Sequence, residues 1–481
     1  MKRRFAFFRP QGTPGSSQER TSTWLLLGFL CLVFLTGGGS RRDIASLALL
    51  RPVAVFACFI ALVSQRREQV RAFAVPVVLI AGGFTLALLQ LVPLPPAWWQ
   101  ALSGREVIVD VTEYAGLGGI WRPLSMDPIG TRNALFSLFV PAFVGLIAIQ
   151  LAPAQRIRVL LSLLAFGLAS AVLAGLQLGG EPDGPLYLYR ITNSGAAVGL
   201  FANRNHQALM LAMMLPLLAY WASLAPKRSV RPGELGRFFN RAAVAAVMAI
   251  LAVAMLLITG SRAGLLLAFA GLVFVPWLGP QAPVAGRSGD AKIAAARWKR
   301  RWWYYLAGLA GLAAITAYAL SQGQAEALNR LFALNLGEDD RAAVLPQLLD
   351  LVRQHWLTGS GFGSFEAVYK IAEPGAQLSP FYLNHAHDDW LEMIITGGLP
   401  AILLFGWLLA AIAMRAIGLA RQWISGAAAP KARLLAFVML LQMAVASIGD
   451  YPLRTPAIAC LFMLALVVFF DKSADLSQSE G

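Results

Sequence analysis

Charged residues and cysteines are both scarce in this sequence of 481 residues. Only 14% of the residues are charged, 58% are hydrophobic, and the mean hydropathy is +0.62. Apolar runs of about twenty residues recur along the chain, and each run is long enough to cross a bilayer. Backbone groups inside a bilayer have no water to bind, so the crossing segments must be helices. The composition therefore excludes a soluble globular protein and predicts an all-α, polytopic membrane protein.

The three cysteines, Cys31, Cys58 and Cys460, lie in apolar runs and form no paired motif. This arrangement excludes a disulfide framework and a cysteine-based metal site. Acidic residues are also few, since 25 Asp and Glu accompany 40 Lys and Arg, for a net charge of +15. The basic residues fall in short loops between apolar runs, as the positive-inside rule requires. They do not form the basic and aromatic face that is typical of a nucleic-acid-binding protein.

The apolar pattern predicts a bundle of about twelve spans with both termini in the cytoplasm. Residues 1–22 form an expected uncleaved cytoplasmic tail, residues 23–470 one transmembrane domain, and residues 471–481 a second cytoplasmic tail. The second span is the least regular, because Arg51 falls inside it. The expected spans are 23–39, 43–63, 72–92, 133–152, 159–178, 203–224, 242–260, 264–281, 303–321, 389–412, 434–449 and 457–470.

Two long loops are expected on the outer side, at residues 93–132 and 322–388. Long ordered loops in a compact protein are usually functional. In the second loop, the segment from Arg341 to Gln354 has apolar residues at helical spacing, which predicts a helix lying along the membrane surface as a lid. The stretch TGSGFGSF is only weakly similar to a nucleotide-binding loop, because no Gly-Lys-Ser/Thr follows it. A turn that places Phe362 and Phe365 is the preferred interpretation.

Titratable groups gather in the stretch LNHAHDDWLEM, at the outer end of the tenth expected span. His385 and His387 could act as a base or as cations against a phosphate, because histidine titrates near neutrality and a helix N-terminus favours anions. In the alternative, Asn384, Asp388 and Asp389 cap the helix while both histidines lie in solvent. A metal site is a third possibility, but no further set of ligands stands out elsewhere in the sequence.

A second polar cluster lies where the sixth span begins. Arg204 is flanked by Asn203 and Asn205, and His206 follows. An interfacial arginine that extends toward lipid headgroups would explain Arg204 alone. A polar cluster at the mouth of a helix, however, often marks a binding site. We therefore expect these four residues to contribute to substrate binding.

Two further arginines are expected on the same outer side. Arg262, in the stretch TGSRAG, is the only charge in the turn between the seventh and eighth spans, and its planar guanidinium suits phosphate. The alternative is again contact with headgroups. Arg341 follows Glu338, Asp339 and Asp340, which could pair with it or cap the loop helix. The hypothesis is that Arg262 and Arg341 converge with Arg204 and His387 on one anion-binding pocket.

Several stretches in this order resemble the bacterial O-antigen ligase and polymerase superfamily: FANRNHQALML, TGSRAGLL, DDRAAVLPQLLDLVRQHWLTGSGFGSF and NHAHDDWLEMIITGGLPA, with WRPLSMDP before them. The resemblance covers roughly residues 93–452. It implies a multi-pass glycosyltransferase of the bacterial inner membrane with a periplasmic active site. Such an enzyme moves a glycan from undecaprenyl diphosphate to an acceptor, with inversion and without a metal, nucleotide or other cofactor.

The resemblance also implies roles for individual residues. His387 corresponds to the essential loop histidine, Asp388 stands where asparagine is common, and His385 is a secondary candidate. Three arginines match those that bind the donor diphosphate, namely Arg204, Arg262 and Arg341. On this basis His387 would take the proton from the acceptor hydroxyl, and the arginines would stabilise the departing diphosphate.

The first expectation for the acceptor is lipid A–core, which makes the protein a ligase. The alternatives within the superfamily are a polymerase of lipid-linked O-antigen or exopolysaccharide repeats, and a protein O-oligosaccharyltransferase. A transporter or flippase of lipid-linked sugars is a rival from another class, and it predicts ionisable residues near the middle of the membrane. Such residues are scarce here, and the polar clusters lie at the outer rim. A structural scaffold would leave the outward arginines unexplained.

Overall fold

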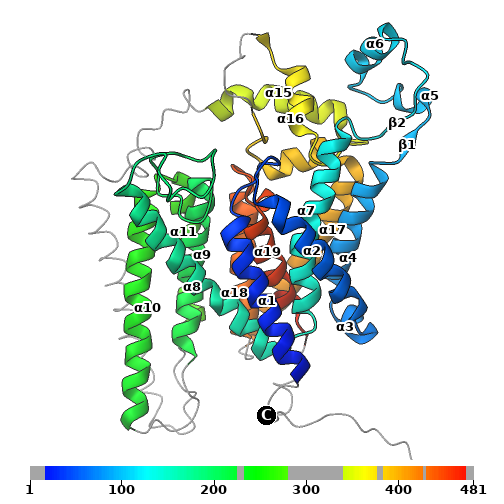
Figure 1. Cartoon of the computed structure of the whole chain (residues 1–481). Helices are drawn as coiled ribbons and strands as arrows, with labels where there is room; N and C mark the ends of the chain where they lie inside the picture. Colours follow the sequence, from blue (N-terminus) through cyan, green and yellow to red (C-terminus); the bar gives the residue numbers. More distant parts are fainter. Residues whose placement is uncertain (1–16, 225–231, 280–339, 376–382, 426–429, 473–481) are drawn as a thin grey trace, which may run out of the picture.

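The computed structural model describes residues 17–224, 232–279, 340–375, 383–425 and 430–472, and within these the chain is almost entirely helical (Figure 1). The elements are α1 (Ser17–Thr36), α2 (Leu47–Val63), α3 (Arg67–Ala72), α4 (Ala74–Leu89), β1 (Pro93–Leu94), α5 (Pro96–Trp99), α6 (Glu106–Tyr114), β2 (Arg122–Pro123), α7 (Pro128–Ala148), α8 (Pro153–Leu178), α9 (Arg204–Ser223), α10 (Pro232–Ile258), α11 (Arg262–Val273), α12 (Val275–Leu278), α15 (Asp340–His355), α16 (Phe365–Ala372), α17 (Asp389–Ile424), α18 (Lys431–Ala446), η2 (Pro452–Arg454) and α19 (Pro456–Phe470).

Five of the described helices are long and apolar enough to cross a membrane. They are α1, α7, α8, α10 and α17, and four shorter apolar helices accompany them, namely α2, α4, α11 and α19. The predicted all-α membrane class is confirmed by these helices. The number of twelve spans stays a prediction, and the expected span at 303–321 lies outside the described residues.

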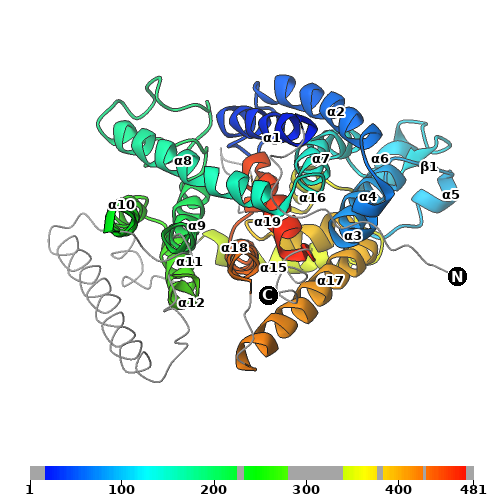
Figure 2. The same cartoon turned by 90° about the horizontal axis from the view of Figure 1, so that it is seen from below.

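The core of the bundle is formed around α18 and α19. Nearly all of α19 is buried, from Pro456 to Phe470, which is the pattern of a helix surrounded by other helices. Figure 2 shows α18 and α19 between two groups of helices, with α9 and α11 on one side and α4 and α17 on the other. Phe437 of α18 packs against Phe469 of α19 with ring centroids 5.9 Å apart. The two central helices therefore fix the positions of both flanking groups.

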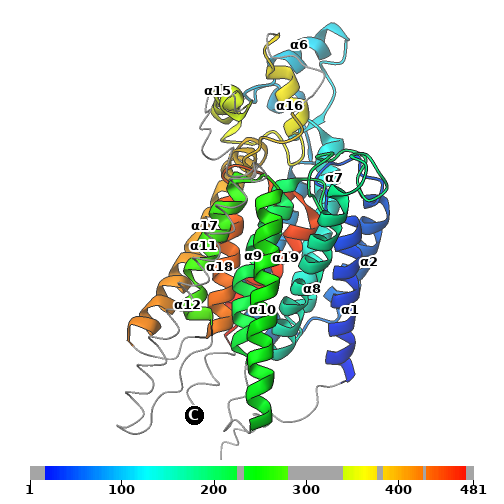
Figure 3. The same ribbon diagram turned by 90° about the vertical axis from the view of Figure 1, so that its left-hand side faces the viewer.

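Four helices begin at the same end of the bundle, and each begins with a side-chain cap. Asp127 accepts from Gly130 N before α7, Asn203 from Asn205 N before α9, Ser261 from Gly264 N before α11, and Asp388 from Leu391 N before α17. Such caps satisfy backbone N–H groups that have no partner inside the helix. This end also carries α5, α6, α15 and α16, and we call it the loop end (Figures 1 and 3).

The expected outer loops are both placed at the loop end. In the first, β1 and β2 pair antiparallel and hold α5 and α6 as an arm, and α7 begins at Pro128, so the loop ends before residue 132. In the second, the predicted helix from Arg341 to Gln354 is confirmed as α15, which lies across the loop end in Figure 1. The segment 322–339 of that loop lies outside the described residues.

The glycine-rich stretch TGSGFGSF, at residues 358–365, packs between these loops and the bundle, and we call it the glycine joint. Gly359 and Gly361 have φ of +74° and +108°, and the N–H groups of Ser360 and Gly361 donate to the carbonyls of Ile395 and Thr396 at 2.9 Å. A Cβ on Gly359 would lie 2.6 Å from the Thr396 carbonyl oxygen. The prediction of a turn, and not a nucleotide loop, is consistent with these contacts, which dock the stretch against α17 just before its kink at Gly398.

Candidate active site

Three of the four histidines surround one tyrosine at the loop end. The ring centroid of Tyr451 lies 5.4 Å from that of His206, 4.5 Å from that of His385 and 4.8 Å from that of His387. The residues come from α9, from the loop before α17 and from the loop between α18 and α19. Sequence reasoning placed these histidines in two separate clusters, and the structure brings them together around Tyr451.

His387 occupies an unusual backbone conformation. Its φ is +52°, and it is the only non-glycine residue with positive φ in the described part of the chain. Histidine tolerates this left-handed region better than most residues, but the conformation still costs free energy. The next residue, Asp388, caps α17 by accepting from Leu391 N at 2.9 Å. His387 therefore lies at a sharp turn where the loop enters α17, with its ring edge-on to Tyr451.

His206 is buried and connects α9 to the loop between α18 and α19. Its Nδ1 atom lies 2.9 Å from the hydroxyl of Thr455, and its Nε2 atom lies 3.7 Å from Oδ1 of Asp450. The second distance is too long for a hydrogen bond but suits an ion pair when the imidazole is protonated. Asp450 is 3% exposed, and its Oδ2 atom has no hydrogen-bond partner in the described part of the chain.

The charge state of Asp450 follows from its neighbours. Burial alone would raise the pKa of this carboxyl group, but His206, the N–H of Tyr451 and the charge of His387 lower it below its usual range. Asp450 is therefore an anion at neutral pH. It lies among the histidines as a fixed negative charge.

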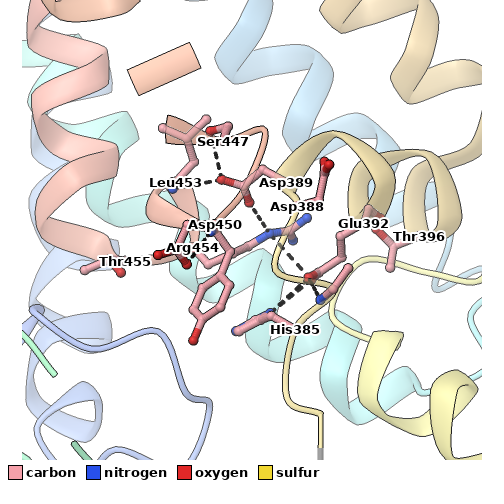
Figure 4. A network of polar contacts seen from close by, with 12 residues as sticks. His385, Asp388, Asp389, Glu392, Thr396, Ser447, Asp450, Leu453, Arg454 and Thr455 are labelled. Carbon is pink, nitrogen blue, oxygen red and sulfur yellow. Dashed lines mark hydrogen bonds and ion pairs between the residues drawn. The ribbon is translucent and has the colours of Figure 1, made fainter. Parts of the chain in front are cut away.

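A buried ion network lies beside the histidines and is shown in Figure 4. The Nε atom of Arg454 lies 3.2 Å from Asp389 and 3.6 Å from Glu392, and His385 Nδ1 lies 3.1 Å from the same Glu392. Asp389 also accepts from the Ser447 hydroxyl and from Leu453 N, both at 3.1 Å. The network therefore joins the first turn of α17 to the loop between α18 and α19, and it fixes His385.

These contacts decide between the two interpretations of the stretch LNHAHDD for three of its residues. Asp388 caps α17, as the capping interpretation expects. Asp389 does not cap the helix, because its carboxylate belongs to the ion network. The His385 side chain is 13% exposed and bonded to Glu392, so it does not lie in solvent. The stretch is thus part of a packed polar site and not only a helix end.

Arg204 and Arg262 are the first residues of α9 and α11, which pack against each other at the loop end. The close approach is set by Gly264, where an added Cβ would lie 2.5 Å from the Cβ of Ala208. Both side chains are half-buried, and Arg204 follows the cap residue Asn203. Two guanidinium groups thus lie at the N-termini of adjacent helices, where the backbone also favours anions.

The remaining predicted residues are placed as follows. Asn203 caps α9 through Asn205 N at 2.9 Å, and the side chain of Asn205 is half-buried. Arg341 is the second residue of α15, and its side chain lies outside the described part of the chain. Its predicted role as a third phosphate ligand therefore stays a prediction. Among the described residues, no group of three or more His, Cys, Asp or Glu side chains is arranged to hold a metal ion.

Three residues of this site were missed by the sequence reasoning, namely Asp450, Tyr451 and Arg454. All three lie in the short stretch GDYPLRTP between the last two helices. Two opposite charges and a tyrosine between two strongly apolar runs were the available signal. The candidate site is therefore formed by the 383–388 loop, the loop between α18 and α19, and the start of α9.

The match to known proteins agrees with this geometry. Residues 246–406 match the family model described as O-antigen ligase, a segment that contains Arg262, Arg341 and both loop histidines. No curated protein matches the sequence. The family and the helices indicate a bacterial membrane protein of the glycosyltransferase-like kind that acts on lipid-linked sugars. The matched segment confirms the resemblance to the O-antigen ligase superfamily that was seen in the sequence.

Proposed function

We propose that the chain is an inverting, metal-independent glycosyltransferase that moves a glycan from undecaprenyl diphosphate to an acceptor hydroxyl. In this proposal the loop end faces the periplasm and the membrane is the bacterial inner membrane. The observation that carries the proposal is the cluster around Tyr451, where His206, His385 and His387 meet close to the start of α9. The family match supports the same class of reaction.

The donor diphosphate is proposed to bind at the N-termini of α9 and α11. Arg204 and Arg262 begin these two helices, and Arg341 is proposed to approach from α15. Guanidinium groups bind phosphate oxygens in a fork geometry, and helix N-termini add free N–H groups. These groups stabilise the negative charge that grows on the diphosphate as it leaves, which is usually a large contribution to catalysis.

His387 is proposed as the general base. The acceptor oxygen attacks the anomeric carbon, the bond from this carbon to the diphosphate oxygen breaks, and undecaprenyl diphosphate leaves as an anion. The hydroxyl proton passes to His387, whose imidazolium is stabilised by the charge of Asp450. No nucleotide is required, because the diphosphate linkage is already activated.

The first candidate acceptor is lipid A–core, which corresponds to a ligase. The second candidate is a glycan that is itself attached to a lipid, which corresponds to a polymerase. The second candidate is favoured by the groove between α4, α7, α17, α18 and α19, whose mostly apolar lining suits a lipid-attached substrate. A protein acceptor is a third possibility within the superfamily. A flippase is disfavoured, because the polar cluster of the described residues lies at one end of the bundle.

The proposal is tested in cells whose only copy of the gene carries His387→Ala, beside wild type and a variant with the exposed Arg158→Gln change on α8. Envelope lipopolysaccharide is separated on a gel, and the glycan on undecaprenyl diphosphate is measured. Loss of long chains from the core, with accumulation of lipid-linked glycan, supports a ligase. A core that bears a single repeat supports a polymerase. An unchanged ladder with a stable variant would refute the role of His387 in lipopolysaccharide assembly.

A further inference from the structure

The kink of α17 leaves a backbone carbonyl without its helical partner. In a regular helix, the N–H of each residue donates to the carbonyl four residues earlier. Pro400 has no N–H, so it cannot donate to the carbonyl of Thr396. The preceding residue, Leu399, uses its N–H outside the helix and donates to the carbonyl of Leu357 at 3.1 Å. The buried carbonyl of Thr396 therefore needs donors from other parts of the chain.

Gln90, the residue that ends α4, supplies one of these donors and links three segments. Its Nε2 atom and the N–H of Gly361 both donate to the carbonyl of Thr396 at 2.9 Å. Its Oε1 atom accepts from the N–H of Phe362, in the glycine joint, at 2.8 Å. Its backbone carbonyl accepts from the N–H of Ser125, at the base of the arm, at 2.8 Å. One amide side chain thus connects the kink of α17 to the glycine joint.

The environment of Gln90 makes these contacts costly to lose. The residue is 5% exposed, and Thr396 is fully buried. A buried donor or acceptor that loses its partner is not compensated by water. An apolar side chain at this position would leave the N–H of Phe362 without this acceptor and remove one of the donors to Thr396. The kink and the joint are therefore expected to move apart when the amide is replaced.

The part of α17 before the kink, residues 389–397, carries much of the candidate site. His387 precedes it at the capped turn, and Asp389 and Glu392 of the ion network lie on its first turn. Within this segment the hydroxyl of Thr396 donates to the carbonyl of Glu392 at 2.6 Å (Figure 4). A sharp kink separates the segment from the rest of the helix. Its direction is therefore set by contacts with neighbouring elements, including the contact with Gln90.

We propose that Gln90 is a positioning residue for the candidate site, and that it acts on His387 through Thr396 and the segment 389–397. The inference rests on the proposed function, in which His387 is the base. In this role Gln90 makes no contact with the reacting atoms. It holds the start of α17 at a fixed angle to α4 and the glycine joint, so that His387 faces the acceptor hydroxyl.

The proposal separates turnover from donor binding. Arg204 and Arg262 begin α9 and α11, which are not joined to Gln90 by the contacts described above. A displaced segment 389–397 should therefore misplace the base while the arginines keep their positions. We expect replacement of Gln90 to lower kcat and to leave the KM for the donor nearly unchanged.

The test is the initial rate of glycan transfer in membrane vesicles, measured against the concentration of lipid-linked glycan extracted from the host cells. Gln90→Met, which has a similar length and no hydrogen-bonding amide, is expected to lower kcat about tenfold or more, because a misplacement of about 1 Å can cost a hundredfold. The KM for the donor should stay within about twofold of wild type. Gln90→Glu is a second variant of the same shape. Its carboxylate can still accept from Phe362 but cannot donate to Thr396, so kcat should again fall.

Gln65→Met is the matched control. The Nε2 atom of Gln65 also bridges two carbonyls, those of Ala61 and Leu146, but it lies near the other end of α7. This variant should lose hydrogen bonds without a change in kcat. Hydrogen exchange of residues 389–399 gives a second readout, since exchange should be faster in Gln90→Met than in both wild type and Gln65→Met.

Three outcomes would overturn the proposal. They are an unchanged kcat in both Gln90 variants, a rise of KM alone, and an equal fall of kcat in Gln65→Met. Failure of the proposed function has a different signature, because His387→Ala would then transfer glycan at the wild-type rate. If His387→Ala is inactive while both Gln90 variants turn over normally, the proposed function stands and only the role of Gln90 is refuted.

Discussion

The Nε2 atom of His206 on α9 lies 3.7 Å from Oδ1 of Asp450, in the loop between the last two helices. This pair joins the helix that carries Arg204 to the loop that carries Tyr451 and Arg454. Asp450 is buried and anionic. It also lies close enough to His387 for the charges of the two side chains to interact. The pair therefore connects the proposed donor site and the proposed base through one carboxylate.

Replacement of Asp450 by asparagine is expected to lower glycan transfer by about tenfold, which is less than the hundredfold or more expected for His387→Ala. The physical reason is that the imidazolium formed by His387 loses a neighbouring negative charge. For the same reason the acid limb of the activity profile should move to lower pH. The measurement is transfer in membrane vesicles between pH 5 and 9, with the exposed Asp110→Asn as control. An unshifted profile would separate Asp450 from the function of His387.

The ion network predicts that replacing Arg454 destabilises the protein more than replacing Glu392 does. Arg454→Gln leaves Asp389 and Glu392 buried without their cation and is expected to cost about 3–5 kcal/mol. Glu392→Gln leaves Arg454 paired with Asp389, so its cost should be clearly smaller. Thermal unfolding of the detergent-purified protein measures both.

The control for this prediction is the exposed pair of Arg353 and Asp350, whose side chains are 77% and 61% exposed. Arg353→Gln should change the unfolding free energy by less than about 1 kcal/mol. If Arg454→Gln and Arg353→Gln melted at the same temperature, the network would not contribute to the fold as described.

The glycine joint predicts a strong effect of a single methyl group. Gly361→Ala places a Cβ against Ser125 at a φ of +108°, so both sterics and backbone conformation oppose it. We expect a loss of about 1–3 kcal/mol and weaker docking of the loops on α17. Gly406→Ala, in the helical part of α17 with nothing within 4 Å, should be neutral or slightly stabilising. Equal stabilities of the two variants, measured by thermal unfolding, would contradict this account of the joint.

The fourth histidine predicts a pH dependence of the arm formed by α5 and α6. His355 of α15 packs on Gly104, and its burial, together with the charge of Arg105, lowers its pKa from 6.5 to about 4, although Glu106 opposes this. The folded protein therefore favours the neutral form of the His355 imidazole. The stability that it contributes is present above pH 6.5 and is lost as the pH falls toward 4, up to about 3 kcal/mol.

Hydrogen exchange of the segment 104–124 in membrane vesicles measures this effect. Protection in wild type should fall between pH 7 and pH 5, whereas a His355→Gln variant should show little change over the same range. A wild-type arm with the same protection at both pH values would show that His355 is not a determinant of arm docking.

Much of the architecture was predictable, because the length of an apolar run can be read directly from a short stretch of sequence. The described helices overlap the expected spans, apart from the one at 303–321, and the helix from Arg341 to Gln354 was found from its periodicity. The helix starts at Asn203, Ser261 and Asp388 also follow from local capping chemistry. The start of α7 was placed too late, because the Asp-Pro sequence at residues 127–128 was not taken as a helix start.

The site was predictable only in part, because it depends on contacts between distant segments. His387 and Arg262 were predicted as site candidates from motifs, but Asp450, Tyr451 and Arg454 lie in a short loop with no motif of its own. Nor could the sequence show that Asp389 turns away from the cap position to meet Arg454, since this depends on how α17 packs against α18. Tertiary contacts of this kind have no signature at short sequence separation.

The left-handed turn at His387 has a consequence for how the reaction is organised. The backbone, with its φ of +52°, sets the direction of this imidazole, and the turn is continuous with the capped start of α17. In the proposed reaction, His387 is therefore oriented before any substrate arrives, so little reorganisation is left for the moment of proton transfer. The strain of this residue, about 1–3 kcal/mol, is then a permanent property of the resting protein and does not have to be generated in each proposed turnover.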